Sequence, residues 1–69
     1  MAEATVARIS EISAQSQQGF EDAIRLGLAR AQKTLRNVRS AWIKEQRVIL
    51  DGTALTFQVN MEVTFILEE

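Results

Sequence analysis

Apolar side chains occupy every odd-numbered position from residue 55 to residue 67 of this 69-residue chain. They are Leu55, Phe57, Val59, Met61, Val63, Phe65 and Leu67, and every even position between them except Ile66 is polar or charged. This period of two is typical of a strand with one buried face. At roughly 3.3 Å per residue the strand spans about 43 Å, which is longer than one helix of so small a domain covers. The strand therefore has to curl around the rest of the chain or reach a neighbouring subunit.

The rest of the chain predicts two more strands and one helix. A first strand is expected over Ala4–Ser13, and a helix over Phe20–Asn37, where apolar residues recur at steps of three and four. A second strand is expected over Ser40–Leu50, and Asp51-Gly52 is a typical hairpin turn before the third strand, Leu55–Leu67. The order β-α-β-β indicates an α+β fold, and the short connections indicate a single domain over residues 1–69.

The predicted helix has recognisable ends and one unusual residue on its apolar face. Ser16 is a candidate cap at its start, and Asn37 is a typical residue at its end. Gly27 lets the helix approach the sheet closely, at a cost of about 1 kcal/mol in helix propensity. The apolar face consists of Phe20, Ala23, Ile24, Gly27, Leu28, Ala31, Leu35 and Val38. Since one helix covers only part of a three-stranded sheet, we expect another copy or a ligand to bury the remainder.

The composition indicates how so small a fold gains stability and argues against nucleic acid as a partner. A core of 69 residues is marginal, and the chain has no Cys for a disulfide and no Cys or His for a zinc site, so oligomerisation is the expected source of added stability. A net charge of -1 gives no basic surface for nucleic acid. Met1 is followed by neither an export signal nor a membrane-spanning apolar run, which favours a cytoplasmic protein without membrane contact.

Catalytic chemistry is not indicated by the residue types present. Without His or Cys, the chain lacks the usual nucleophiles and bases. Glu11, Glu45 and Glu62 each interrupt a strand, and we interpret them as solvated residues or as partners of nearby Arg and Lys side chains. The alternative is that carboxylates from several copies converge on a hard cation. We therefore expect that the protein is not an enzyme. The sequence of a single chain does not identify any residue as a metal ligand.

Two polar-face residues are candidates for binding a small molecule. Trp42, the only Trp, shares a strand face with Ser40 and Lys44 rather than with Ile43 and Ile49 if the strand alternates regularly. It is suited either to fill a subunit contact or to stack on a flat ligand. On the polar face of the third strand, Gln58 has an amide that offers both a donor and an acceptor to the edge of a heterocycle.

Several segments resemble the dodecin family. They are Phe20-Glu-Asp-Ala-Ile, the run Ala29-Arg-Ala-Gln-Lys-Thr-Leu-Arg-Asn-Val, the strand segment Phe57-Gln-Val and the ending Val63-Thr-Phe-Ile-Leu-Glu. The resemblance extends from about Ala7 to Glu68. It implies a three-stranded antiparallel sheet partly wrapped around one helix, and twelve copies assembled into a hollow cage of cubic 23 symmetry. Such a homododecamer would account for the overlong third strand.

The resemblance also implies a site for flavin, as riboflavin or FMN, between subunits. Flavin-binding dodecins stack the ring on a Trp early in the second strand and hold its edge with a Gln in the third. That Gln corresponds to Gln58, but the Trp position is Ser40, which has no ring. Trp42 lies on the same face about 6.6 Å further along the strand and is a candidate substitute. Glu45 corresponds to an acidic residue that gates the empty pocket in some dodecins.

One segment points to a different ligand. The sequence Val38-Arg-Ser-Ala-Trp-Ile-Lys-Glu-Gln is similar to a dodecin subgroup that lacks the stacking Trp and has been linked to calcium. The resemblance therefore implies a dodecameric cage that binds and stores flavin. The alternative is the same cage without flavin, which binds cations such as calcium or acts as a structural assembly.

Overall fold

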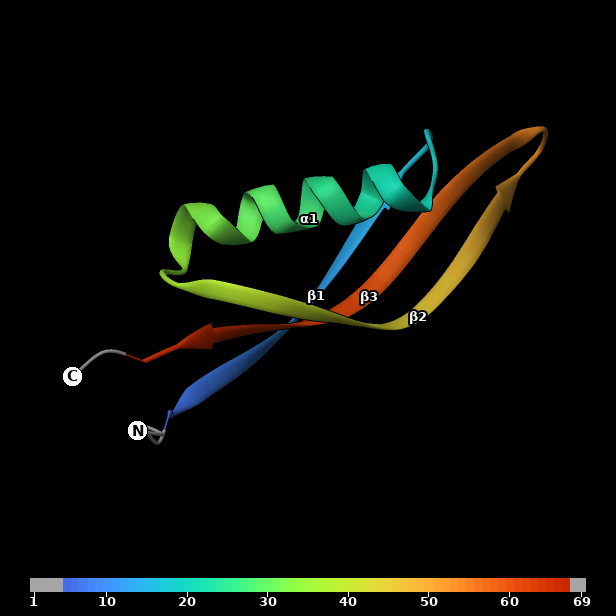
Figure 1. Ribbon diagram of the computed structural model, residues 1–69. Coiled ribbons are helices and arrows are strands. Elements are labelled where there is room, and N and C mark those ends of the chain that lie inside the picture. The colour runs from blue at the N-terminus through green and yellow to red at the C-terminus, as the bar shows by residue number, and fades with distance from the viewer. Residues whose placement is uncertain (1–4, 68–69) are drawn as a thin grey trace.

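The long alternating segment forms the central strand of a three-stranded antiparallel sheet. The computed structural model describes residues 5–67 and has the element order β1 (Ala7–Ser16), α1 (Phe20–Thr34), β2 (Val38–Asp51) and β3 (Ala54–Ile66). The strand order is β1-β3-β2, so β3 pairs with both other strands. The helix α1 lies across one face of this curved sheet (Figure 1). The predicted β-α-β-β order and antiparallel sheet are thus confirmed.

Two predicted boundaries were wrong by about three residues. The strand β1 runs from Ala7 to Ser16 rather than over Ala4–Ser13, and Ala4 lies outside the described residues. The helix ends at Thr34 rather than at Asn37, because Leu35 is already extended, with φ -111° and ψ 138°. The N–H of Leu35 still donates to the carbonyl of Ala31 at 2.9 Å and closes the last turn.

The start of the helix does not use the predicted cap. Gly19 is the N-cap residue, and its φ of 150° lies in a region that favours glycine. Ser16 is buried at the end of β1, where its hydroxyl donates to the Asp22 carboxylate at 2.5 Å and accepts the N–H of Gln18 at 2.9 Å. Ser16 therefore ties the connection to the first helical turn instead of capping the helix.

The core lies between α1 and the odd-numbered residues of β3. Its fully buried members are Ala23, Val59, Met61 and Val63. At its edge the rings of Phe20 and Phe57 meet edge to face, with centroids 5.1 Å apart. The even-numbered residues of β3 consequently point to the other face of the sheet, which we call the open face.

Two bulges in β2 change which of its residues lie on the open face. The pairing with β3 shifts register between Val38 and Ser40 and again between Ile43 and Glu45. Because each bulge adds one residue, side chains on either side of it exchange faces. The residues of β2 that pair with even positions of β3, and so lie on the open face, are Ser40, Trp42, Glu45, Arg47, Ile49 and Asp51. The prediction that Trp42 shares a face with Ser40 is confirmed. The prediction that Ile49 lies on the opposite face from Trp42 was wrong, because the second bulge brings both side chains to the same face.

The β2–β3 hairpin extends well past the helix (Figure 1). The chain measures 55 Å along its longest axis and only 20 Å and 16 Å across it. Near the turn, Leu50 is 74% exposed, and Val48 and Leu55 are also exposed. Exposed apolar side chains grouped on a projecting hairpin are typical of a surface that another chain covers.

Substitution of Gly27 by Ala is expected to destabilise the fold. An added Cβ would lie 2.5 Å from Met61 Cε and 3.1 Å from Ala14 Cβ. The Met61 side chain can turn aside, but Ala14 Cβ is fixed to its strand, so overpacking at about 1–3 kcal/mol outweighs the gain of about 1 kcal/mol in helix propensity. Denaturant unfolding at fixed protein concentration should show a lower free energy of unfolding for Gly27→Ala. The loss should shrink in a Met61→Leu background, and a gain in stability would contradict the close approach.

Replacement of Asn37 tests the turn between α1 and β2. Asn37 has φ 60°, in the left-handed region, and its carbonyl accepts the N–H of Ile66 at 3.1 Å. A Cβ-bearing residue without the local hydrogen bonding of Asn pays about 1 kcal/mol there. Asn37→Ala should therefore lower the free energy of unfolding by about that amount, whereas Asn37→Gly should leave it unchanged or raise it. Equal losses for the two variants would show that the backbone angle is not the cause.

Candidate functional site

Gln58 is the centre of a polar network on the open face. It lies in the middle of β3 and is only 9% exposed. Its Oε1 accepts hydrogen bonds from Gln15 Nε2 at 3.2 Å and from Arg47 Nε at 3.1 Å. Its Nε2 donates to Asn60 Oδ1 at 2.9 Å. Neighbouring strands on both sides therefore hold this amide, since Gln15 belongs to β1 and Arg47 to β2.

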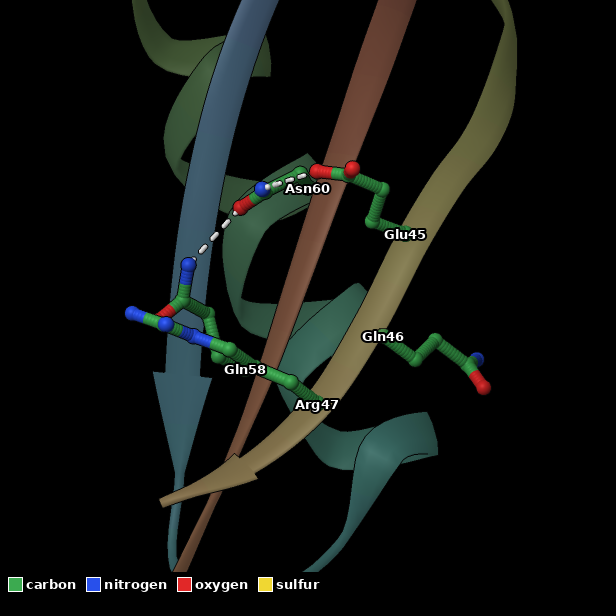
Figure 2. Close-up of a pocket in the computed structure, with 5 residues that line it drawn as sticks. All are labelled: Glu45, Gln46, Arg47, Gln58 and Asn60. Atoms are coloured by element: carbon green, nitrogen blue, oxygen red, sulfur yellow. Dashed lines mark hydrogen bonds between the residues drawn. The ribbon is translucent and has the colours of Figure 1, made fainter.

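Asn60 extends the network to a carboxylate. Its Nδ2 donates to Glu45 Oε1 at 3.0 Å (Figure 2). The contacts follow the sheet register, in which Asn60 faces Glu45 and Gln58 faces Arg47 across the β2–β3 pair. The second bulge of β2 is what puts Glu45 and Arg47 on this face. Within residues 5–67, no buried side-chain nitrogen or oxygen lacks a hydrogen-bond partner.

A cavity of about 540 Å³ opens beside this network. It is lined by Glu45, Gln46, Arg47, Gln58 and Asn60. The side chain of Gln46 points away from the other four, as Figure 2 shows. The remaining groups are two amides, a guanidinium and a carboxylate. A volume of this size is typical of small-molecule sites, and these groups suit a polar ligand edge rather than a purely apolar one.

Trp42 lies on the same face but outside this cavity. Its side chain is 69% exposed, and Lys44 Nζ sits 5.3 Å from the ring centroid. In the register Trp42 pairs with Glu62, four residues along β3 from Gln58. At about 3.3 Å per residue, that separates their backbones by roughly 13 Å. Within one chain, Trp42 and Gln58 therefore do not form a single pocket.

The structure places the four predicted site residues in two groups. Glu45 and Gln58 line the cavity together. Ser40 is opposite Thr64, still further along the sheet from Gln58 than Trp42 is. Ser40 is exposed like Trp42, and no aromatic side chain stands at its position. A site that uses both groups needs a second copy of the chain.

Sequence reasoning missed Gln15, Arg47 and Asn60 as members of the site. The alternation of β3 already puts Asn60 on the face of Gln58, so that residue was detectable. Arg47 was not detectable, because regular alternation through β2 puts it on the face opposite to Trp42. The same alternation misplaces Glu45, which only the resemblance to dodecins indicated as a site residue. Only the extra residue at the second bulge reverses this.

The carboxylates predicted as possible cation ligands lie on the open face but are spread along it. Glu11 and Glu62 are directly opposite each other in the β1–β3 register. Glu62 lies 3.8 Å from Lys44 Nζ, and Glu45 bonds Asn60. Among residues 5–67, no three His, Cys, Asp or Glu side chains are grouped so as to hold a metal ion. In the same range, no helix combines the length and apolar character needed to span a membrane.

Comparison with known proteins gives one consistent result. The family model described as Dodecin matches residues 6–68. A dodecin from Thermus thermophilus is 43% identical over 60 residues, which cover 86% of this chain and 87% of that protein. The solved dodecin from Streptomyces davaonensis has a TM-score of 0.91 and 34% identity, and the match covers 97% of this chain and 100% of that one.

A relative that binds calcium also shares the fold. It is calcium dodecin from Mycobacterium tuberculosis, a calcium-chelating antigen with a calcium-binding site, which has a TM-score of 0.82 and 25% identity over 91% of each chain. Dodecins are small-ligand-binding proteins rather than enzymes, and they assemble as homo-oligomers. Because the family match spans nearly all described residues and the fold agrees with it, this chain belongs to the dodecin family.

Proposed function

We propose that this protein binds and stores flavin, as riboflavin or FMN, in a hollow homododecameric cage. The observation that carries the proposal is the buried amide of Gln58, held in a polar network beside an open cavity on the face that also presents the exposed ring of Trp42. A planar heterocycle needs an apolar surface for its ring and polar groups for its edge. The open face offers both.

The separation of these groups favours a site shared between copies. In one chain about 13 Å of strand separates Trp42 from Gln58, so the edge of a ring held at Gln58 lies beyond the reach of the same chain's indole. A neighbouring copy across a symmetry axis supplies its own Trp42 to the ring. In this arrangement Trp42 replaces the aromatic side chain that is absent at Ser40, and Glu45 borders the pocket that the flavin edge enters.

Replacement of Trp42 by Ala should abolish flavin binding without disrupting the cage. The wild type should quench riboflavin and FMN fluorescence saturably, because the ring stacks on the indole. Trp42→Ala should lose this quenching, whereas Trp42→Phe should retain weaker binding through its smaller ring. Sedimentation should give the same assembled mass for all three proteins. Unchanged affinity of Trp42→Ala would contradict the stacking role, and a wild-type mass near 7.8 kDa would contradict the cage.

Calcium is the second candidate ligand, and two observations favour it. One is the likeness to the calcium dodecin from Mycobacterium tuberculosis. The other is the direct pairing of Glu11 with Glu62, which places two carboxylates side by side across β1 and β3. Like charges in this position are unfavourable. Lys44 Nζ, 3.8 Å from Glu62, offsets part of this repulsion, and a bound cation would offset more of it. Hard cations such as calcium need several oxygens, so copies around a symmetry axis would have to contribute further ligands.

Replacement of Glu11 by Gln separates the calcium candidate from a flavin-only cage. In calcium-free buffer Glu11→Gln should stabilise the protein by about 0.5 kcal/mol, because it removes the repulsion from Glu62. The gain should diminish at high salt. If calcium binds here, added calcium should raise the melting temperature of the wild type but not that of Glu11→Gln. Glu21→Gln, on the exposed face of α1, is the control that should respond like the wild type. An unchanged wild-type melting temperature would remove the calcium candidate.

A further inference from the structure

The side chain of Lys44 covers part of the Trp42 ring. Its Nζ lies 5.3 Å from the centroid of the indole, which is within the range of a cation–π contact. In such a contact the ammonium sits over a face of the ring, where the π electrons give a negative potential. Trp42 is the only Trp of the chain, and its ring is the stacking surface of the proposed function. One face of that surface is therefore occupied by a side chain of the same subunit.

The second bulge of β2 leaves Lys44 without a partner in β3. The register shifts between Ile43 and Glu45, so Lys44 is the extra residue of the bulge. Its side chain instead reaches Glu62, the residue of β3 that pairs with Trp42, and the Nζ lies 3.8 Å from Glu62 Oε2. Lys44 thus bridges the two members of one cross-strand pair, an indole and a carboxylate.

Two carboxylates favour this position of the ammonium. The Glu62 side chain is 29% exposed, so its attraction for Lys44 is screened less than that of a fully exposed ion pair. Glu11 lies directly opposite Glu62 on β1, and its charge adds to the negative potential. Moving the ammonium into water gives up these attractions together with that of the indole. A flat ligand that takes the same ring face has to compensate for this loss through its own stacking.

We propose that the Lys44 ammonium, anchored by Glu62, is an internal competitor for this face of Trp42, and that a flat ligand stacks there only after displacing it. The inference rests on the proposed function, in which the indole is the stacking surface for flavin. Binding is then weaker than an uncovered indole would give, and the returning ammonium assists release of the ligand. Both effects suit a protein that stores a small molecule and later gives it up.

The first test is a fluorescence titration of the assembled protein with riboflavin. Riboflavin carries no phosphate, so removing a positive charge from the protein does not change a direct ionic contact with the ligand. Lys44→Ala should bind riboflavin more tightly than the wild type by about two- to fivefold, the strength of an exposed cation–π contact. Added salt should narrow this difference, because screening weakens the attraction between Lys44 and Glu62.

A matched control removes the same charge outside the site. The chain has two Lys residues, and the second, Lys33, is exposed on α1. Lys33→Ala should leave the affinity for riboflavin at its wild-type value. Equal affinities of the wild type and Lys44→Ala would overturn the proposal, and so would an equal gain in both variants.

A second measurement needs no ligand and separates this inference from the flavin proposal. In protein labelled with ¹³C at the lysine ε-carbon, NMR should show two signals, one for Lys44 and one for Lys33. The ring current of the indole should shift the ε-methylene protons of Lys44 upfield, while those of Lys33 keep their ordinary position.

Two variants assign this shift to its causes. Trp42→Ala should abolish the upfield shift, and Glu62→Gln should reduce it, because the ammonium then loses its anchor. A Lys44 signal that does not move in Trp42→Ala would overturn the proposal. If riboflavin binds to neither the wild type nor Lys44→Ala, the flavin proposal fails, and the NMR shift still decides whether Lys44 covers the ring.

Discussion

The pairing of β3 with a strand on each side is the constraint on which the rest of the structure depends. Because β3 is central, its odd-numbered side chains build the core under α1 and its even-numbered side chains build the open face. A one-residue slip would exchange the two sets and bury Gln58, Asn60 and Glu62 under the helix. The core and the candidate site therefore lie on the two faces of one strand. A change in the pairing register of β3 would alter both at once.

The same strand gives a physical reason to expect assembly with other copies of the chain. It is much longer than α1, so the hairpin it forms with β2 extends beyond the helix and leaves Val48, Leu50 and Leu55 exposed. A chain of this size without disulfides has little other means of gaining stability. Membership of the dodecin family, whose members are homo-oligomers, agrees with this physical argument.

Ligand chemistry is where this chain departs from the flavin-binding pattern of its family. Ser40 has no aromatic ring, whereas Gln58 is present on β3 and bonds to Gln15, Arg47 and Asn60. Trp42 returns an aromatic ring to the open face, but at another position along the strand. Under the proposed function, the choice between flavin and a cation would depend on how neighbouring copies combine Trp42, Gln58 and the carboxylates, rather than on any group within one subunit.

The alternation of β3, the apolar face of α1 and the turn at Asp51-Gly52 are local patterns, so the sequence by itself determined the element order, the antiparallel hairpin and the faces of Gln58 and Trp42. It did not determine the two bulges of β2, because an extra residue in a strand leaves no mark on composition or spacing. Pairing with β3 decided them, and the second bulge brought Glu45 and Arg47 to the face of Gln58. The pairing of β2 with β3 therefore decided that Glu45 and Arg47 belong to the site, since a strand's neighbours fix which side of the sheet each residue occupies.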